Sequence, residues 1–434
     1  MDVKIKNPFV LSLQKKFEKA LLGFEPFEEK PRLGVAVSGG PDSLALTFLA
    51  NDWAKKNSGS IIAFTIDHGI RKESKAESLY VKNILSSNGI EHHIHRYSGK
   101  KPSAGIQDFA REIRYRYLSE MCKKHEILHL FIAHHSQDQN ETILMREWQG
   151  SGKIGLAGIS AIIEMDSCRI LRPLLKIGPH ELKKYLDYMG VDWIDDYSNL
   201  NKNFLRTKAR DYLKKNNLNI KKDGSTIRRK YESSIASWLS SYAEIFPLGY
   251  MKFKLYDLIK VEPDIRSYII RQSILTISGK KYHPSEKSTE NILKNLKFKN
   301  KTWSLGGCLI CSKGEEIYII REIGRINEKL KITNGINFIW DNRFQILITT
   351  NLIGDFWIAA LKEEGLREIE EIRPKLSKKP LERLIYMGLP ALWSSEGVVA
   401  CSQLSYNNSE DLSYYSQFEP RHRLIPCSFV IVND

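Results

Sequence analysis

The residues with the clearest chemistry form the segment Ser38-Gly39-Gly40-Pro41-Asp42-Ser43, which follows an apolar run and precedes a helix-like stretch. Two adjacent glycines let the backbone turn tightly and bring its N–H groups close to a phosphate. Proline suits the first helical turn, and a helix N-terminus presents its positive end to an anion. The segment lacks the Gly-Lys-Ser/Thr of a Walker A loop. It therefore predicts a phosphate-binding loop of another kind.

An acidic residue, Asp42, lies inside this loop. A carboxylate beside phosphates is favourable only when a cation lies between them, so we assign Asp42 to Mg²⁺. The alternative is a strand–turn–helix connection that binds no ligand, in which Asp42 only caps the helix. The two glycines between a buried strand and a helix favour the phosphate site.

Two carboxylates, Asp138 and Glu141, lie three residues apart and so share one face of the helix expected over residues 137–148. This helix follows a strand that ends near Ala133, so both acids would lie at the ligand edge of a parallel sheet. They could hold an ammonium group or take a proton from an attacking amine. The alternative is a pair of solvated acids at a helix N-terminus, where the helix dipole favours negative charge.

Histidines and arginines are expected beside these acids. His134 and His135 stand at the exit of the strand, without the helical spacing and third ligand of a zinc site. We interpret at least one as a polar group that contacts nucleotide or substrate; the other could be a structural histidine. Arg111 and Arg114 share one face of the helix expected over residues 107–124 and could bind phosphate or stabilise a transition state. We favour Arg114, and surface ion pairs are the alternative.

These side chains need a scaffold, and the first half of the chain alternates between apolar runs and helical patterns. Strands separated by helices of this length imply an α/β fold with a parallel, doubly wound sheet. Ligands of such sheets bind at the C-terminal ends of the strands. The expected strands are 33–38, 60–67, 91–96, 129–133 and 168–171, and the expected helices are 43–56, 74–87, 107–124, 137–148 and 179–189.

The alternation stops near residue 200, where a basic segment begins. Residues 206–230 contain ten lysines and arginines against two aspartates, which favours contact with a phosphate backbone over a merely solvated surface. Residues 226–296 are mainly helical in pattern, residues 303–321 predict a β-hairpin, and strands follow from about residue 331. We therefore expect three domains: 1–215, a mainly helical 216–328, and a small α+β or β domain at 329–434.

The composition fits a folded, basic protein. The 434 residues carry 66 Lys+Arg against 51 Asp+Glu, and the net charge of +15 favours a polyanionic partner. We expect no membrane span and no secretory signal, and six cysteines are too few for a disulfide framework, so a cytoplasmic location is expected. Cys308 and Cys311 lack the second pair of a zinc site and are expected to pack in a strand.

The loop at residues 38–43 resembles the Ser-Gly-Gly-x-Asp-Ser signature of the PP-loop ATP pyrophosphatases, which cleave ATP between its α- and β-phosphates. Three further blocks resemble the tRNA(Ile)-lysidine synthetase family: Ile66–Arg71 with Ser74 and Glu77, Gly105–Tyr115, and Ala133–Thr142. The strong resemblance covers about residues 30–212, with weaker similarity later in the chain. Thr207 departs from the family, which more often has asparagine there, so only Arg206 and Arg210 are carried over from that motif.

The resemblance implies a function and a set of site residues. A family member uses ATP to adenylate the C2 oxygen of the wobble cytidine in tRNA(Ile) with a CAU anticodon. L-lysine then displaces AMP, forms lysidine and switches codon reading from AUG to AUA. Both later domains would bind tRNA. The implied ATP-binding residues are Ser38, Gly39, Gly40, Pro41, Asp42, Ser43, Asp67, His68 and His134. The implied lysine- or tRNA-binding residues are Asp138, Glu141, Arg206 and Arg210, and the catalytic residues are Asp42, Arg114, Asp138 and Glu141.

Several alternatives stay open at this point. Asp67 could be only a capping residue, the group that deprotonates lysine is undecided, and so is the oligomeric state, with a homodimer as one alternative. A tRNA 2-thiolation enzyme of the same superfamily would need sulfur-handling cysteines, and Cys122 and Cys168, alone in the first domain, do not form a sequence pair. A basic RNA-binding protein with a degenerate loop is the third alternative, and the intact glycines and Asp42 argue against it.

Overall fold

The computed structural model describes residues 7–67, 74–99, 106–165, 167–194, 205–218, 220, 224–296, 300–332, 336–350, 352, 354–374, 376–377, 379–409 and 412–425. The chain divides into two compact units, with the boundary between Arg229 and Lys230. This boundary lies inside helix α9 (Gly224–Tyr242). Of the helices in the described ranges, none is long and apolar enough to cross a membrane.

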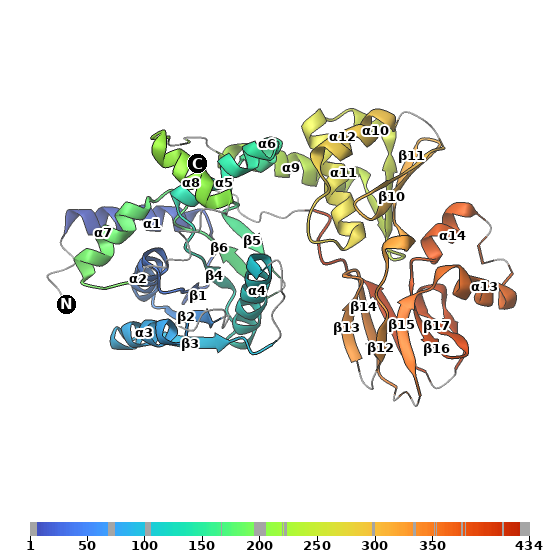
Figure 1. The fold of residues 1–434 in the computed structure, drawn as a ribbon, viewed down its shortest axis with the longest axis horizontal. Helices are drawn as coiled ribbons and strands as arrows, with labels where there is room; N and C mark the ends of the chain where they lie inside the picture. Colours follow the sequence, from blue (N-terminus) through green and yellow to red (C-terminus); the bar gives the residue numbers. More distant parts are fainter. Residues whose placement is uncertain are drawn as a thin grey trace. The chain divides into compact units, whose positions relative to one another are not determined.

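The first unit is built on one six-stranded sheet (Figure 1). Its strands, in spatial order, are β3 (Glu91–Arg96), β2 (Ser60–Asp67), β1 (Arg32–Ala36), β4 (His129–Phe131), β6 (Arg169–Leu171) and β5 (Ile162–Glu164). All neighbours are parallel except β5, which pairs antiparallel with β6 at the edge. The chain moves from β1 outward to β3 and then returns to β4 on the other side of β1. The loop that follows β1 therefore lies at a topological switch point, where ligands of such sheets bind.

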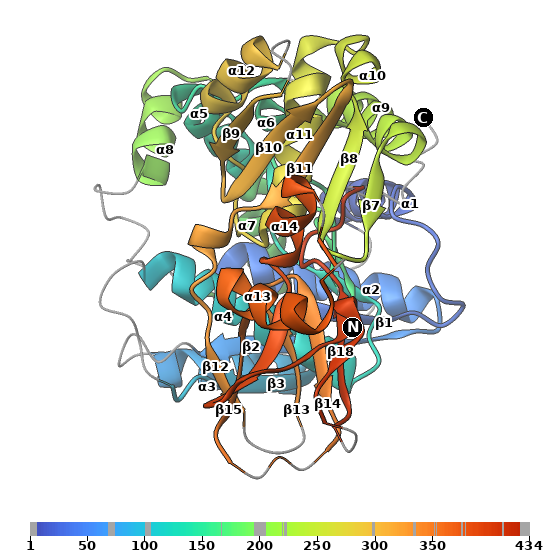
Figure 2. The ribbon, with the colours of Figure 1, turned by 90° about the vertical axis from the view of Figure 1, so that its right-hand side faces the viewer.

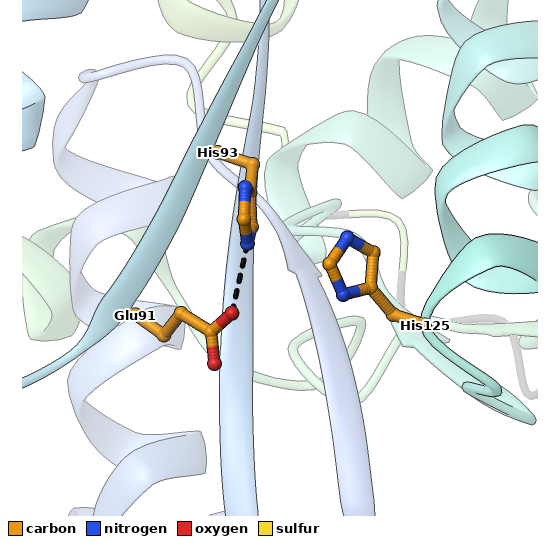
Figure 3. Close-up of side chains that lie close together, drawn as sticks. All are labelled: Glu91, His93 and His125. Atoms are coloured by element: carbon orange, nitrogen blue, oxygen red, sulfur yellow. Dashed lines mark hydrogen bonds and ion pairs between the residues drawn. The ribbon is translucent and has the colours of Figure 1, made fainter.

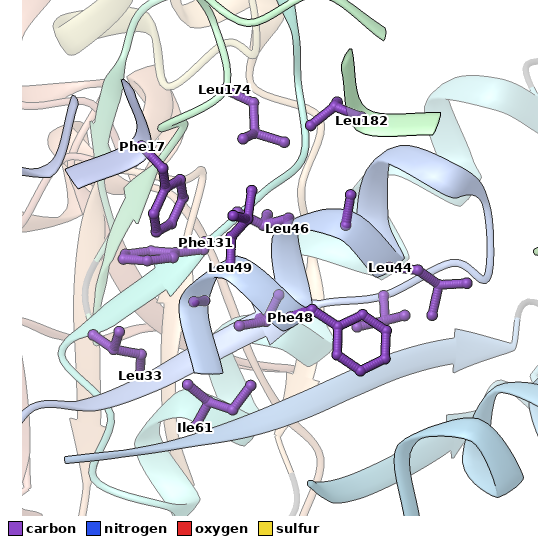
Figure 4. Packing of buried hydrophobic residues seen from close by; sticks show 14 of the residues in the cluster. Phe17, Leu33, Leu44, Leu46, Phe48, Leu49, Ile61, Phe131, Leu174 and Leu182 are labelled. Atoms are coloured by element: carbon purple, nitrogen blue, oxygen red, sulfur yellow. The ribbon is translucent and has the colours of Figure 1, made fainter. Parts of the chain in front are cut away.

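Helices cover both faces of this sheet. Those that precede α9 are α1 (Pro8–Leu22), α2 (Pro41–Lys56), α3 (Ser74–Ser87), α4 (Ile106–Lys124), α5 (Ser136–Trp148), α6 (Lys153–Leu156), α7 (Pro179–Met189) and α8 (Leu205–Lys215). Alternate residues of β2 separate the faces: Ile61 packs in the core with α1, α2 and α7, whereas Ile62 packs with residues of α4. Figure 4 shows the first core, where Phe17, Leu46 and Phe131 meet. The predicted parallel, doubly wound sheet is confirmed.

Several local differences separate this unit from the sequence-based expectation, among them helices α6 and α8, which were not expected. The N-terminal helix α1 was not expected, although Val10, Leu13, Phe17 and Leu21 recur at helical spacing and are buried. The antiparallel edge strand β5 was also missed, because a three-residue strand carries too little periodicity to be recognised. Strand β4 ends at Phe131 rather than at residue 133, so the two histidines that follow lie in a loop.

The second unit begins with a mixed region. A five-stranded antiparallel sheet has the order β7 (Glu244–Phe246), β8 (Tyr250–Lys254), β11 (Glu316–Arg321), β10 (Cys308–Lys313) and β9 (Thr302–Leu305), and Figure 2 shows its central strands side by side. The helices that follow α9 here are α10 (Leu255–Ile259), α11 (Pro263–Ser278) and α12 (Glu286–Asn295). The predicted hairpin is confirmed as β10–β11. The expectation of a mainly helical 226–296 missed β7 and β8. These strands pair with each other, and β8 also pairs with β11, more than 60 residues away.

The C-terminal part of this unit is α+β. One sheet has the order β12 (Leu330–Ile332), β15 (Phe356–Ala360), β16 (Pro390–Ser394), β17 (Gly397–Cys401) and β18 (Tyr406–Asn407), and a second has β13 (Ile336–Trp340), β14 (Phe344–Ile348) and β19 (Tyr414–Phe418). Helices α13 (Lys362–Ile372) and α14 (Pro380–Tyr386) accompany them, with short 3₁₀ turns at Ile323–Arg325 and Ser402–Leu404. The expected strands near 338, 345, 356 and 398 are all present.

A buried ion cluster connects the two parts of the second unit. Arg321, at the end of β11, donates from Nε and Nη2 to the two carboxylate oxygens of Asp341 at 2.9 Å each. Arg343 also donates to Asp341, at 2.7 Å, and is itself almost fully buried. A buried charge is tolerated only when it is paired and hydrogen-bonded, which both arginines satisfy here. The contact fixes the β13–β14 turn against the end of β11.

Cys308 and Cys311 pack within β10, as expected. Cys308 is fully buried, and its thiol donates to the carbonyl of Ile274 at 3.6 Å. Cys311 instead accepts from the Thr302 hydroxyl at 3.5 Å. Residues three apart on a strand point to opposite faces. The two thiols therefore lie in different surroundings, and each packs against its own neighbours.

Candidate active site

The loop after β1 is held in a tight bend by its two serines. The backbone N–H of Ser38 donates to the Ser43 hydroxyl oxygen at 3.1 Å, and the Ser43 hydroxyl donates to the carbonyl of Gly40 at 2.9 Å. Helix α2 begins directly afterwards, with Pro41 in its first turn and Gly40 as the N-cap residue. Gly40 has no side chain that could cap this helix end. The free N–H groups of the first turn and the bend together form an anion-binding geometry.

Gly39 has a conformation that only glycine adopts easily. Its φ is +88°, and a Cβ there would lie 2.8 Å from Val81 Cγ2 and 2.8 Å from Ile194 Cδ1. The carbonyl of Gly39 also accepts from the backbone N–H of Ile194 at 3.0 Å. The backbone must therefore pass close to its neighbours, and a side chain would push the bend out of place.

We expect Gly39→Ala to weaken ATP binding and to lower the free energy of unfolding by about 1–2 kcal/mol, because alanine is strained at this φ. Isothermal titration with ATP and urea unfolding would measure both effects. Gly89→Ala is the matched control, since Gly89 has a φ of +67° and no heavy atom within 4 Å of the added Cβ. The control should lose stability but keep ATP affinity; equal ATP affinity in both variants would contradict the role of the bend.

Asp42 faces the same loop, and its carboxylate is only partly satisfied. One oxygen, Oδ2, lies 3.4 Å from His135 Nε2. The other, Oδ1, is buried and has no hydrogen-bond partner among the residues that the structure describes. An orphaned carboxylate oxygen beside a phosphate-binding bend is a suitable ligand for a hard cation such as Mg²⁺. The donor set present therefore fits the predicted metal.

His135 links the loop to helix α5. Its ring accepts from the backbone N–H of Asp138 at 3.4 Å, and Asp138 Oδ2 accepts in return from the backbone N–H of His135 at 2.9 Å. This reciprocal pair is a capping box, with histidine as the N-cap residue. Burial disfavours the imidazolium, but the carboxylates of Asp42, Asp138 and Glu141 outweigh it and raise the pKa of His135. The histidine thus positions Asp42 and Asp138 together.

The predicted acids and arginines meet in one ion cluster between α5 and α8. Arg206 donates from Nη2 to Asp138 Oδ1 at 2.7 Å and from Nε to Glu141 Oε2 at 2.8 Å. Arg210 donates from Nε to Glu141 Oε1 at 2.6 Å. Glu141 is completely buried. Burial opposes its ionisation, yet hydrogen bonds from both arginines outweigh that effect and lower the pKa of this carboxyl.

His134 is oriented by Arg172, a residue whose importance the sequence-based site list missed. Arg172 is buried and donates from Nε to His134 Nδ1 at 3.0 Å, and from Nη1 to the carbonyl of Ser160 at 2.6 Å. Burial, followed by the positive charges of Arg172 and Arg206, lowers the pKa of His134 to about 3. The ring is therefore neutral near physiological pH. An arginine placed directly after the apolar strand 169–171, at the ligand edge, was the available signal.

We expect the neutral His134 to make stability depend on pH. The pKa of His134 in the folded protein lies below its ordinary value of 6.5. Between pH 6.5 and about 3, His134 is therefore protonated in the unfolded chain but neutral in the folded one. The stabilisation is complete above pH 6.5 and is lost as the pH falls. Urea unfolding at neutral pH and near pH 5 should show that the free energy of unfolding falls more for the wild type than for His134→Gln. Equal losses would contradict a neutral His134.

Arg111 and Arg114 lie on α4, and both are exposed. Arg111 lies over the ring of Tyr115, 5.1 Å from its centroid. Both arginines are close enough to His134 for their charges to lower its pKa. Although Arg114 is exposed as a residue, burial around its guanidinium, together with the charge of Arg111, lowers the pKa of that group. The structure thus places the predicted catalytic arginine on the side of α4 that faces His134.

Asp67 ends strand β2 and has a protein partner. Its carboxylate is buried and accepts from Arg96 Nε at 2.8 Å. This ion pair joins the C-terminal ends of β2 and β3. His68, the neighbouring predicted ATP-binding residue, lies outside the described residues.

The described cations of the basic segment fall into two groups: arginines bonded to other parts of the protein, and exposed lysines. Arg206 and Arg210 bind the acids of α5, and Arg228 donates to the carbonyl of Gly158 at 2.7 Å. The lysines of α8, by contrast, are exposed: Lys208, Lys214 and Lys215. An exposed aromatic pair, Trp148 and Tyr212, lies beside them with ring centroids 5.7 Å apart. Arg206 and Arg210 thus already have protein partners, and phosphate contact by this segment stays a prediction.

Cys122 and Cys168 of the first unit lie close together, although they are far apart in the sequence. Cys122 and Cys168 belong to the core that packs with α4, and their mutual contact, with burial, raises the pKa of the Cys122 thiol. Cys168 precedes β6, whereas the loop at residues 38–43 follows β1. In a parallel sheet, the residues before a strand and the residues after a strand lie at opposite ends of the strands. Neither thiol is therefore near the loop.

Comparisons with known proteins identify the family of the chain. The PP-loop domain family matches residues 10–217. A tRNA(Ile)-lysidine synthase of Rickettsia bellii (strain RML369-C) is 31% identical over 408 residues, which cover 90% of this chain and 93% of that protein. Proteins of the same name from Orientia tsutsugamushi (strain Boryong) and Wolbachia pipientis wMel are 31% and 32% identical to this chain, and the matches cover 92% and 87% of it.

Among solved structures, a U34-tRNA thiolase from Methanococcus maripaludis matches 53% of this chain and 80% of its own, with 19% identity and a TM-score of 0.43. So distant a likeness carries no argument about activity. The relatives, by contrast, extend over nearly the full length of the chain, and the loop, acids and arginines described above lie within the matched region. The chain therefore belongs to the tRNA(Ile)-lysidine synthase family.

Proposed function

We propose that this enzyme joins L-lysine to the wobble cytidine of tRNA(Ile) in two steps, adenylation of the base and attack by lysine, with the residues around the loop Ser38–Ser43 in defined roles. The activity itself, formation of lysidine on tRNA(Ile), follows from membership of the family. Use of ATP follows from the PP-loop domain. The observation that supports the residue roles is the meeting of the loop, Asp42, His135 and the acids of α5 in one place.

In the first step the C2 oxygen of the cytidine attacks the α-phosphate of ATP, and pyrophosphate leaves. The bend of residues 38–43 and the start of α2 bind the phosphates through backbone N–H groups. Asp42 would hold Mg²⁺, which neutralises phosphate charge when bound. Arg114, exposed on α4, offers a guanidinium to the charge that develops on the phosphates. His134, neutral and fixed by Arg172, can contact the nucleotide without adding charge.

In the second step the lysine ε-amine attacks C2, and AMP leaves. Adenylation has converted a poor leaving oxygen into a good one. The amine is protonated near neutral pH, with an ordinary pKa of about 10.4, so it must lose a proton before it attacks. Asp138 and Glu141 are the acids that receive the ammonium group. Arg206 already bridges both, whereas Arg210 contacts only Glu141, so the incoming ammonium must displace Arg206 or share the acids with it.

The tRNA needs a basic surface beside this site, because the target base must be unstacked to reach the loop. Exposed Lys208, Lys214 and Lys215 on α8 can contact phosphates, and the exposed Trp148–Tyr212 pair can stack on a base. The second unit, residues 230–426, supplies further tRNA contacts in this proposal. Such an enzyme would act in the cytoplasm, where tRNA and free lysine are present.

Incubation with ATP, Mg²⁺, radiolabelled lysine and bulk bacterial tRNA, followed by nucleoside analysis, tests the proposal. Radioactive lysidine that forms only with ATP present is the expected product. A 2-thiolated nucleoside formed from a sulfur donor would instead support the thiolation alternative. Buried Cys122 and Cys168, at the edge of the sheet opposite the loop, speak against that alternative. Tight tRNA binding without ATP turnover would contradict an enzymatic function.

A further inference from the structure

We propose that Glu91, His93 and His125 form a binding site for a divalent transition-metal ion such as Zn²⁺, separate from the active site. Figure 3 shows the three side chains converging, two from β3 and one from the end of α4. One ligand atom from each residue lies within 4.8 Å of the others. Two imidazoles and a carboxylate form a ligand set that suits Zn²⁺ and similar ions. The inference does not depend on the proposed lysidine chemistry.

The strand places two of the ligands together. Glu91 and His93 are two residues apart in β3, so both side chains point to the same face of the sheet. His93 Nε2 and Glu91 Oε1 are 2.8 Å apart. In the parallel register, His93 pairs with Phe64 and Glu91 pairs with Ile62, two buried residues of the core that packs with α4. The backbone that carries both ligands is therefore held by regular pairing.

The third ligand is positioned by the end of α4. His125 follows the last helical residue, and the backbone N–H of Ile127 returns to the carbonyl of Cys122 at 2.8 Å. Glu126 between them has a φ of +55°, which completes a Schellman-type helix end. The His125 ring lies 4.6 Å from that of His93 and 5.8 Å from that of Phe64, between centroids. The side chain is thus directed toward β3 by a fixed turn.

His125 has a polar atom that the protein leaves unsatisfied. Its Nε2 is buried and has no hydrogen-bond partner among the described residues. An unpaired buried nitrogen costs free energy unless a ligand or an ion satisfies it. Around a tetrahedral Zn²⁺ the ligand atoms lie about 3.4 Å apart, so small side-chain rotations would close the set. Glu91 is exposed, so solvent can supply the remaining ligand.

The position in the sheet indicates what the ion would do. Glu91 begins β3, so the three residues lie at the amino-terminal edge of the parallel strands, opposite the edge that carries residues 38–43. An ion there cannot touch the bound nucleotide. It would instead tie the edge strand β3 to the end of α4, which borders the same core. The site therefore predicts stabilisation by metal rather than catalysis.

Equilibrium dialysis of the full chain against Zn²⁺ alone, after treatment with a chelator, tests the proposal. We expect one saturable site in the wild type, weakened more than about tenfold in His93→Ala and in His125→Ala. His180→Ala is the matched control, because His180 is exposed on α7 and belongs to no cluster of ligands in the described structure; it should bind as the wild type does.

Thermal unfolding supplies the second readout. Zn²⁺ should raise the melting temperature of the wild type and of His180→Ala, and should have no such effect on His125→Ala. Circular dichroism without metal verifies that each variant is folded, so a folding defect would not be mistaken for lost binding. Absence of saturable binding in the wild type would overturn the proposal, and so would wild-type affinity for Zn²⁺ in folded His93→Ala and His125→Ala.

Discussion

Replacing Asp42 by alanine or asparagine is expected to abolish ATP-dependent incorporation of lysine into tRNA. Asp42 presents a buried, unpartnered oxygen beside the phosphate-binding bend. If Asp42 holds Mg²⁺ as proposed, the substitution removes a ligand of the ion, and the phosphate charge would no longer be neutralised. We expect the rate to fall by at least about 1,000-fold, which corresponds to about 4 kcal/mol of transition-state stabilisation. Filter binding of radiolabelled lysine to tRNA measures the loss.

The asparagine variant is the more informative of the two, since it keeps the shape of the side chain and removes only its charge. Asp187→Asn is a matched control for the same chemical change, because Asp187 is exposed near the end of α7. It should retain wild-type activity. Wild-type lysine incorporation by folded Asp42→Asn would show that the metal is held elsewhere, and the assignment of Asp42 would then be wrong.

Replacing Glu141 by alanine should both destabilise the first unit and abolish activity. Glu141 is completely buried and neutralises Arg206 and Arg210, which would lose their shared partner. We expect the free energy of unfolding to fall by about 2–3 kcal/mol. This is less than the cost of breaking a fully buried ion pair, because both arginines are more than a third exposed. Urea unfolding at neutral pH measures this loss, and lysine incorporation measures the effect on the site.

A double-mutant cycle separates the ion pair from other effects of the substitution. Because Arg210 contacts Glu141 directly, the combined Glu141→Ala and Arg210→Ala variant should lose less stability than the sum of the single variants. Glu147→Ala is the control on the same helix, since Glu147 is exposed and should change stability little. Strict additivity of Glu141→Ala and Arg210→Ala would contradict the coupling that the geometry implies.

The sequence was sufficient to predict the sheet and the loop. Short apolar runs that alternate with helical patterns are typical of a parallel sheet. The loop between β1 and α2 could be recognised from Gly39, Gly40 and Pro41, whose backbone preferences favour a tight bend followed by a helix. The acids Asp138 and Glu141 could be placed on one helical face because their spacing is a local property. Each of these inferences depends on residues that are close in the sequence.

The partners of those residues could not be predicted in the same way. Arg206 meets Glu141 across 65 residues, and His134 meets Arg172 across 38 residues. Such contacts depend on how helices and strands pack, which no local pattern encodes. The same limit applies to β8, whose other partner is the distant β11, and to Glu91, His93 and His125, which were not recognised as neighbours.

The most direct test of the central claim is to follow the α-phosphate of ATP. In the proposed reaction, ATP bound at residues 38–43 activates an RNA base before lysine reacts. With ATP radiolabelled at the α-phosphate, and with tRNA(Ile) but no lysine, label should appear on the tRNA. Added lysine should then release it as AMP while lysidine forms. Label that appears instead on lysine in the absence of tRNA would contradict the account.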